Sequence, residues 1–134
     1  MQVHGSCHCG AISYEAVVDP ERVTICHCTD CQMLTGSAYR VSVPARAEDL
    51  HWVSGSPKVY VKVGASGSGR AQGFCGDCGS PLYTHAAVAR PETYGLRVGC
   101  IREREALTPR KRIWCRSALA WSTDLRGMVE REQE

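Results

Sequence analysis

The sequence predicts a mainly β protein, a single domain of short antiparallel strands. Three observations support this prediction. Apolar and polar residues alternate over many short segments, and glycine- or proline-rich turns separate these segments. The chain has 134 residues, a length that suits one domain with a modest core. Nine residues are cysteines, and seven of them lie in C-x-C or C-x-x-C clusters, a pattern typical of metal binding.

The first half of the chain is expected to form short, half-buried strands. Residues 11–18 form the first, which ends at the turn signal Asp19-Pro20. Residues 22–25 form a short strand that leads directly into a cysteine cluster. Residues 38–43 alternate apolar and polar side chains, and Pro44 is expected to end this strand.

The second half is expected to continue in the same way. Residues 51–53 and 58–63 flank the turn-forming residues 54–57, so a hairpin is predicted there, followed by a flexible loop over residues 64–69. Further strands are expected over residues 81–84, 94–101 and 111–115, with one helical turn over 86–90 and Trp121 packed back onto the domain. The domain is expected to span residues 1–123, with residues 124–134 as a polar tail that forms at most a frayed helix.

Composition argues against several classes of protein. The net charge is only +2, and the densest basic stretch is residues 110–112, so no nucleic-acid partner is expected. No apolar run approaches the roughly 20 residues that cross a bilayer, so no membrane association is expected. Residues 1–7 lack the basic and apolar regions of a signal peptide, and the cysteine count is odd. We therefore expect a cytoplasmic protein whose cysteines bind metal rather than form a disulfide framework.

Three cysteines within six residues, Cys26, Cys28 and Cys31, form the densest cluster. In extended backbone Cys26 and Cys28 leave the same face, and a C-x-x-C turn can bring two thiolates around one ion. Zinc prefers four such ligands at about 2.3 Å. The cluster supplies three, so the fourth position is either open for chemistry or filled from elsewhere in the chain, by His8, His27, His85, Cys100 or Cys115.

Cys7 and Cys9 need a second pair of ligands, and the C-x-x-C turn of Cys75 and Cys78 supplies one. This pairing predicts a structural zinc site with four cysteines that ties the N-terminal segment to the middle of the chain. The rival pairing joins Cys75 and Cys78 to the Cys26 cluster and leaves Cys7 and Cys9 without partners. The first pairing is preferred because it places seven cysteines in two sites. The isolated Cys100 and Cys115 are expected to be small apolar core residues.

Three ordered motifs resemble the glutathione-dependent formaldehyde-activating enzyme (GFA) family, to which the centromere protein V domain also belongs. The resemblance covers about residues 3–121, and its motifs are Gly5-Ser6-Cys7-His8-Cys9-Gly10, Cys26-His27-Cys28-Thr29-Asp30-Cys31-Gln32 and Phe74-Cys75-Gly76-Asp77-Cys78-Gly79. It implies a β domain of the tent-like zinc fold with two zinc ions, one structural (Cys7, Cys9, Cys75, Cys78) and one functional (Cys26, Cys28, Cys31). Two positions depart from the family pattern, because Gln72 replaces a frequent arginine and Cys100 lies in a stretch usually free of cysteine.

The resemblance also implies an activity. The expected function is that of a carbon–sulfur lyase-type enzyme, in which glutathione or a similar thiol at the three-cysteine zinc condenses with formaldehyde or a related small carbonyl. Thr29, Asp30 or His27 are candidates for proton transfer, and Arg40 or Arg70 for binding the glutathione carboxylates. Two alternatives stay open: a protein that binds or carries thiols without turnover, and a structural or interaction module in which both zinc ions are structural.

Overall fold

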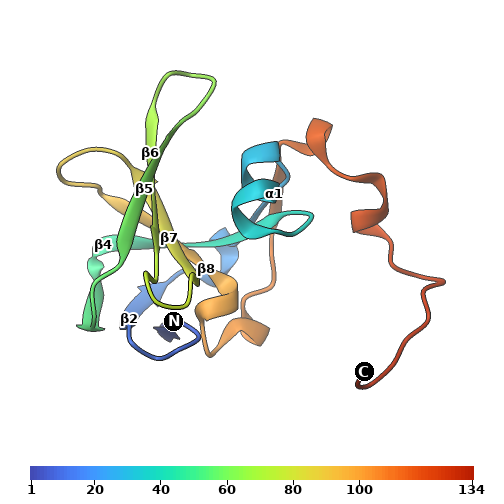
Figure 1. Cartoon of the computed structure of the whole chain (residues 1–134), viewed down its shortest axis with the longest axis horizontal. Coiled ribbons are helices and arrows are strands. Elements are labelled where there is room, and N and C mark those ends of the chain that lie inside the picture. Colours follow the sequence, from blue (N-terminus) through green and yellow to red (C-terminus); the bar gives the residue numbers. More distant parts are fainter.

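The computed structural model describes residues 1–134 and consists of nine β-strands, one α-helix and several short 3-10 helices (Figure 1). The strands are β1 (Gln2–Ser6), β2 (Ser13–Val18), β3 (Thr24–Cys26), β4 (Arg40–Ser54), β5 (Lys58–Val63), β6 (Gly69–Phe74), β7 (Pro81–Ala86), β8 (Thr93–Arg97) and β9 (Lys111–Ile113). The helix is α1 (Thr29–Thr35), and the 3-10 helices are η1 (Pro20–Arg22), η2 (Val98–Cys100), η3 (Arg104–Ala106), η4 (Cys115–Ser117) and η5 (Ala120–Thr123). The predicted mainly β, single-domain fold is confirmed. None of the helices has the length and hydropathy of a membrane span.

The strands form one sheet in the order β1-β2-β4-β8-β7-β6-β5, and the neighbours along this path are antiparallel. Strand β3 pairs with the start of β4, and β9 adds to β3 in parallel. The long strand β4 is the centre of this arrangement, because its first half pairs with β3 and β8 and its second half with β2. Pro44 does not end β4, contrary to expectation. Val43 and Ala45 on either side of it pair with β8 and carry the strand through.

The core is small and is formed by side chains of the central strands and of the turns that join them. Its fully buried side chains include Tyr14 of β2, Leu82 of β7 and Leu96 of β8. Cys7 and Cys75 belong to the same cluster and are almost completely buried. Only 24 of the 134 residues are buried, so apolar packing contributes less here than in a larger domain.

The predicted hairpin over residues 51–63 is wrong. Strand β5 pairs with β6 across the glycine-rich turn that follows it, and the end of β4 pairs with β2 instead (Figure 1). Both connections contain turn-forming residues, so local sequence cannot decide between them. The pairing of β2 decides which hairpin forms. Strand β2 pairs with the end of β4 through Ser13–Ser54 and Tyr14–Trp52, so β5 does not pair there.

Four expectations for the C-terminal half also need correction. Residues 87–90 form a bend rather than a helical turn. The strand expected over residues 94–101 stops at Arg97, and η2 begins at Val98. Strand β9 is exposed along its whole length and is not a core strand. Trp121 is 57% exposed, so it does not pack back onto the domain. Residues 124–134, which follow η5, contain no helix.

Candidate metal centres

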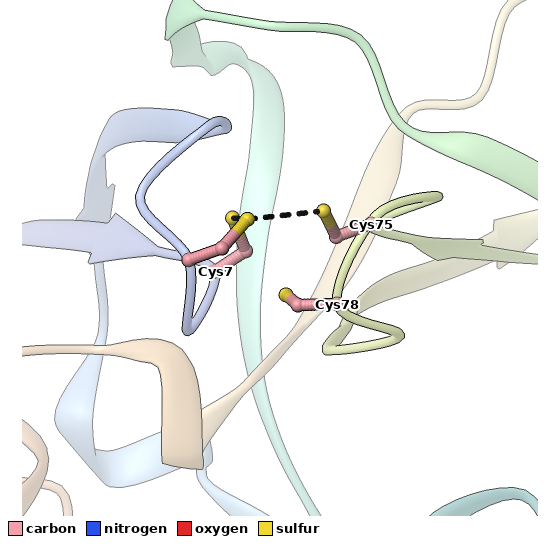
Figure 2. A group of neighbouring side chains, drawn as sticks. Cys7, Cys75 and Cys78 are labelled. Atoms are coloured by element: carbon pink, nitrogen blue, oxygen red, sulfur yellow. Dashed lines mark hydrogen bonds between the residues drawn. The ribbon is translucent and has the colours of Figure 1, made fainter.

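Cys7, Cys9, Cys75 and Cys78 form one group, in which all four sulfurs lie within 4.8 Å of one another. Figure 2 shows the two turns facing each other, with the Cys7 turn after β1 and the Cys75–Cys78 turn between β6 and β7. The Sγ atoms of Cys7 and Cys9 are 3.6 Å apart, and those of Cys9 and Cys75 are 3.8 Å apart. We call this the four-cysteine group.

Tight turns bring these sulfurs together. The amide of Gly79 donates to the carbonyl oxygen of Cys75 at 2.9 Å, and Gly79 has a φ of +77°, a left-handed conformation that favours glycine. The hydroxyl of Ser80 lies 3.2 Å from the Cys78 sulfur. This hydroxyl and the amide of Ser80 both form hydrogen bonds with the sulfur, and together they lower the pKa of Cys78 to about 5. The turn therefore stabilises a thiolate, the form that binds metal.

Cys26, Cys28 and Cys31 form the second group, with three sulfurs within 4.8 Å of one another. Cys26 ends β3, Cys28 caps the N-terminus of α1, and Cys31 lies in the first turn of that helix. The amide of Cys31 donates to the Cys28 sulfur at 3.3 Å. A hydrogen bond from Cys31 lowers the pKa of Cys26 to about 5, and the same bond raises the pKa of Cys31. We call this the three-cysteine group.

Helix α1 was missed by the sequence analysis although it positions two of these three sulfurs. Signals for it are present: Asp30 lies in the first turn, and Gly36 ends the helix with a φ of +62°. The cap itself is unusual, because a cysteine sulfur replaces the usual Ser, Thr, Asp or Asn oxygen. A search for ordinary capping residues therefore does not find this helix.

The candidate fourth ligands all lie outside the three-cysteine group. His27 is 1% exposed and packs edge-on against Tyr39. His85 stacks on Tyr83, and the Cys100 thiol donates to the carbonyl of Pro81 at 3.2 Å. The remaining two candidates are exposed, His8 in the turn after β1 and Cys115 at the start of η4. Cys100 packs against the core as expected, whereas the expected core position of Cys115 is wrong.

Comparison with known proteins assigns the chain to a family. Residues 2–117 match the family model for the glutathione-dependent formaldehyde-activating enzyme. The chain belongs to the GFA family. A crystal structure of a Rhodobacter sphaeroides protein has a similar fold, with a TM-score of 0.61 and 23% identity over 81% of this chain and 98% of the other. No curated protein matched the chain.

The segment that matches the GFA family contains both cysteine groups. Sets of three or four cysteine sulfurs at this spacing bind zinc in preference to harder divalent cations. The residues present therefore fit zinc in both places. Membership of the GFA family and the two cysteine groups together indicate that the protein binds zinc.

Next to the three-cysteine group, the sheet of this GFA-family protein presents buried polar side chains. Arg40 and Arg97 are 5% and 4% exposed, and both donate to the side-chain oxygen of Gln72, at 2.9 and 3.2 Å. Arg97 also donates to the Ser42 hydroxyl at 2.8 Å. Sequence reasoning selected Arg40 but missed Arg97, because no local motif marks a side chain that becomes important through cross-strand pairing.

The other candidate side chains lie on more open parts of the same region. Arg70 is partly exposed, two residues before Gln72 on β6. Asp30 accepts a hydrogen bond from the Lys62 ammonium at 2.8 Å, which holds the pKa of the Asp30 carboxyl below its usual value. This ion pair fixes the first turn of α1 to the β5–β6 hairpin.

Proposed function

We propose that this GFA-family protein is a zinc-dependent enzyme of the carbon–sulfur lyase type. Its substrates are a small thiol, glutathione in view of the family, and formaldehyde or a related small carbonyl. The four-cysteine group holds a structural zinc and the three-cysteine group a functional one, which gives two zinc ions per chain. The proposal places the protein in the cytoplasm, with no nucleic-acid or membrane partner.

The difference between the two cysteine groups is the observation that supports this function most directly. One group offers four sulfurs and the other three, and in each group the sulfurs lie within 4.8 Å of one another. Four thiolates complete a tetrahedral zinc site, whereas three leave one position to a ligand from outside the chain. Zinc, when bound, supplies that position and lowers the pKa of a thiol that occupies it.

The reaction that follows is a simple addition. The substrate sulfur attacks the carbonyl carbon, one S–C bond forms, and the C=O π bond breaks. The thiol proton ends on the former carbonyl oxygen, so the product is an S-hydroxymethyl thioether and no oxidant or reductant is needed. Three protein thiolates already place negative charge around the metal, which favours delivery of a thiolate over activation of water.

Asp30 is the candidate for moving the thiol proton. Its carboxyl is partly exposed, adjacent in sequence to Cys31, and ionised at neutral pH, and it accepts a hydrogen bond from the Lys62 ammonium. An ionised carboxylate can accept the proton as the thiol enters. His27 is a poorer candidate, because its ring is buried against Tyr39. Thr29 opens the same helix turn but is not a base near neutral pH.

Arg70 remains the candidate contact for a glutathione carboxylate. It is partly exposed and lies two residues before the buried Gln72 on the same strand, so a bound molecule can reach it. Arg40 is almost completely buried and already donates to Gln72, so it is a poorer candidate than Arg70 for contact with a carboxylate.

A native mass spectrum with and without glutathione tests the proposal. We expect two zinc ions per chain and one glutathione adduct in the wild type, and loss of the adduct in Cys28→Ser with one zinc retained. Cys115→Ser is the matched control, because Cys115 is exposed and belongs to neither group. An adduct that survives in Cys28→Ser would contradict the assignment.

Kinetics then separate an enzyme from a carrier. Thiols add to formaldehyde without a catalyst, so the rate must be compared at catalytic and at stoichiometric amounts of protein. An enzyme accelerates product formation over many turnovers per chain. A burst limited to one product per chain would favour a thiol carrier, and two zinc ions with no adduct would favour a structural or interaction module.

A further inference from the structure

Two buried arginines lie beside the three-cysteine group without an acidic partner. Neither Arg40 nor Arg97 forms an ion pair, and their shared acceptor, Gln72, is neutral. The Nε atoms of both guanidinium groups are buried and lack a hydrogen-bond partner. Buried charges are ordinarily paired with an opposite charge, so these two cations call for a counter-charge from another source.

The strand register places that source next to them. Cys26 of β3 and Arg40 of β4 are direct partners in an antiparallel ladder, so their side chains leave the same face with Cβ atoms about 5 Å apart. Ser42 is two residues further along β4, on the same face, and its direct partner on β8 is Arg97. One face of the sheet therefore presents a cysteine of the three-cysteine group and both guanidinium groups.

The electrostatics of Arg97 agree with this placement. Burial, together with the nearby Arg40 charge, lowers the pKa of Arg97 to about 9, while the sulfurs of Cys31 and Cys26 act in the opposite direction. In the four-cysteine group, by contrast, the pKa values of Cys7, Cys9 and Cys78 are shifted by burial and by hydrogen bonds, among them one with the hydroxyl of Ser80, and by no arginine or lysine.

Charge counting gives these arginines a specific consequence. Three thiolates and one Zn²⁺ carry a net charge of −1, which becomes −2 when the fourth ligand is a thiolate and stays −1 when it is neutral. The two buried guanidinium groups, Arg40 and Arg97, together carry +2, and the nearby Arg70, which is partly exposed to solvent, adds further positive charge. The charge of the metal centre and the two buried arginines is thus balanced only when an anionic ligand occupies the fourth position, and in a low-dielectric setting such balance favours that state.

We propose that Arg40 and Arg97 are the fixed counter-charge of the three-cysteine centre and make it select an anionic fourth ligand over a neutral one. The inference rests on the proposed function, since it concerns what the open position binds. This role differs from the recognition of a substrate carboxylate, because the arginines balance the negative charge of the metal centre itself. They are positioning residues that need not touch the rest of the substrate.

The test uses protein loaded with Co²⁺ in place of zinc, whose visible absorption changes when the fourth ligand changes. Two probes are titrated: 2-mercaptoethanol, which binds as a thiolate and carries no carboxylate, and imidazole, which binds as a neutral ligand. Arg97→Met and Arg40→Met remove one charge each, and Arg97→Lys keeps it. Arg46→Met is the surface control, because Arg46 is exposed and pairs with Glu48 and Asp49.

We expect each Met variant to lose about tenfold or more in affinity for 2-mercaptoethanol, equivalent to about 1.4 kcal/mol, with little change for imidazole. Arg97→Lys should keep most of the thiol affinity, and Arg46→Met all of it. A variant that retains Co²⁺ in both centres has kept its fold, and the two Met variants provide independent tests if one of them does not fold.

The other outcomes are distinguishable. If the wild type takes up no thiol, the proposed function fails and this inference fails with it. If the wild type binds thiol and the Met variants bind both probes with unchanged affinity, only the inference is overturned. If the Met variants lose affinity for glutathione but not for 2-mercaptoethanol, the arginines recognise carboxylates, and the charge-selection inference is likewise overturned.

Discussion

Replacing Cys75 by serine should unfold most of the protein. Cys75 is 1% exposed and is at once a member of the apolar core and of the four-cysteine group. It lies 66 residues from Cys9 in the sequence, and their sulfurs are 3.8 Å apart. A metal at this group would therefore close a long loop and hold the end of β1 against the turn between β6 and β7.

The magnitude follows from the size of the core. A structural zinc in a small domain contributes about 10–16 kcal/mol of binding free energy to folding. The whole free energy of unfolding of a small domain is about 5–15 kcal/mol. With only 24 buried residues, this protein has little apolar packing to compensate. The small core places the protein at the low end of that range, so losing even half of the metal contribution, about 5–8 kcal/mol, would leave the unfolded state dominant at 25 °C.

Far-ultraviolet circular dichroism with urea titration measures this effect. The wild type should show one cooperative transition, whereas Cys75→Ser should lack it and bind less zinc. Cys115→Ser should behave as the wild type, because Cys115 is exposed and outside both groups. A Cys75→Ser protein with the wild-type unfolding midpoint would refute the reasoning and show that packing alone maintains the fold.

Two further predictions concern the N-terminal strand. Gly5→Ala should destabilise the protein by about 1–3 kcal/mol in urea titrations, because a Cβ at Gly5 would overlap the ring of Tyr14, while Gly64→Ala, which has space, should not. Glu103 accepts hydrogen bonds from His4, which lower its pKa from 4.5 to about 2. Its contribution is thus complete above pH 4.5 and lost as the pH falls towards 2. The stability difference between wild type and Glu103→Gln should be constant from pH 8 to 5 and shrink below 4.5. A difference that changes between pH 8 and 5 would contradict the assignment to Glu103.

The cysteine motifs were informative because their geometry is local. Cys26 and Cys28 are two residues apart in extended chain, and the Cys75–Cys78 turn is a local one in which Gly79 adopts a positive φ. Family membership could be read from the same residues, since the matched region contains all three motifs. The alternating segments likewise predicted strands, because period-two burial is a property of each segment alone.

Pairing between segments could not be read in this way. The start of β5 was expected beside the end of β4, but β2 pairs there, and β5 pairs with β6. The same limit explains why Arg97 was missed. Its importance comes from lying opposite Ser42 and sharing the Gln72 oxygen with Arg40, three contacts that join strands distant in sequence.

The two cysteine groups differ in their surroundings as well as in their number of sulfurs. The four-cysteine group lies between two turns and merges with the apolar core through Cys7 and Cys75, a setting that suits a closed structural site. The three-cysteine group lies at the start of a helix, beside two buried cations that lack an acidic partner. Uncompensated buried charge is unfavourable for folding alone. Its presence beside the group with three sulfurs, and not beside the group with four, is the expected arrangement if the missing fourth ligand arrives from solution and brings a negative charge.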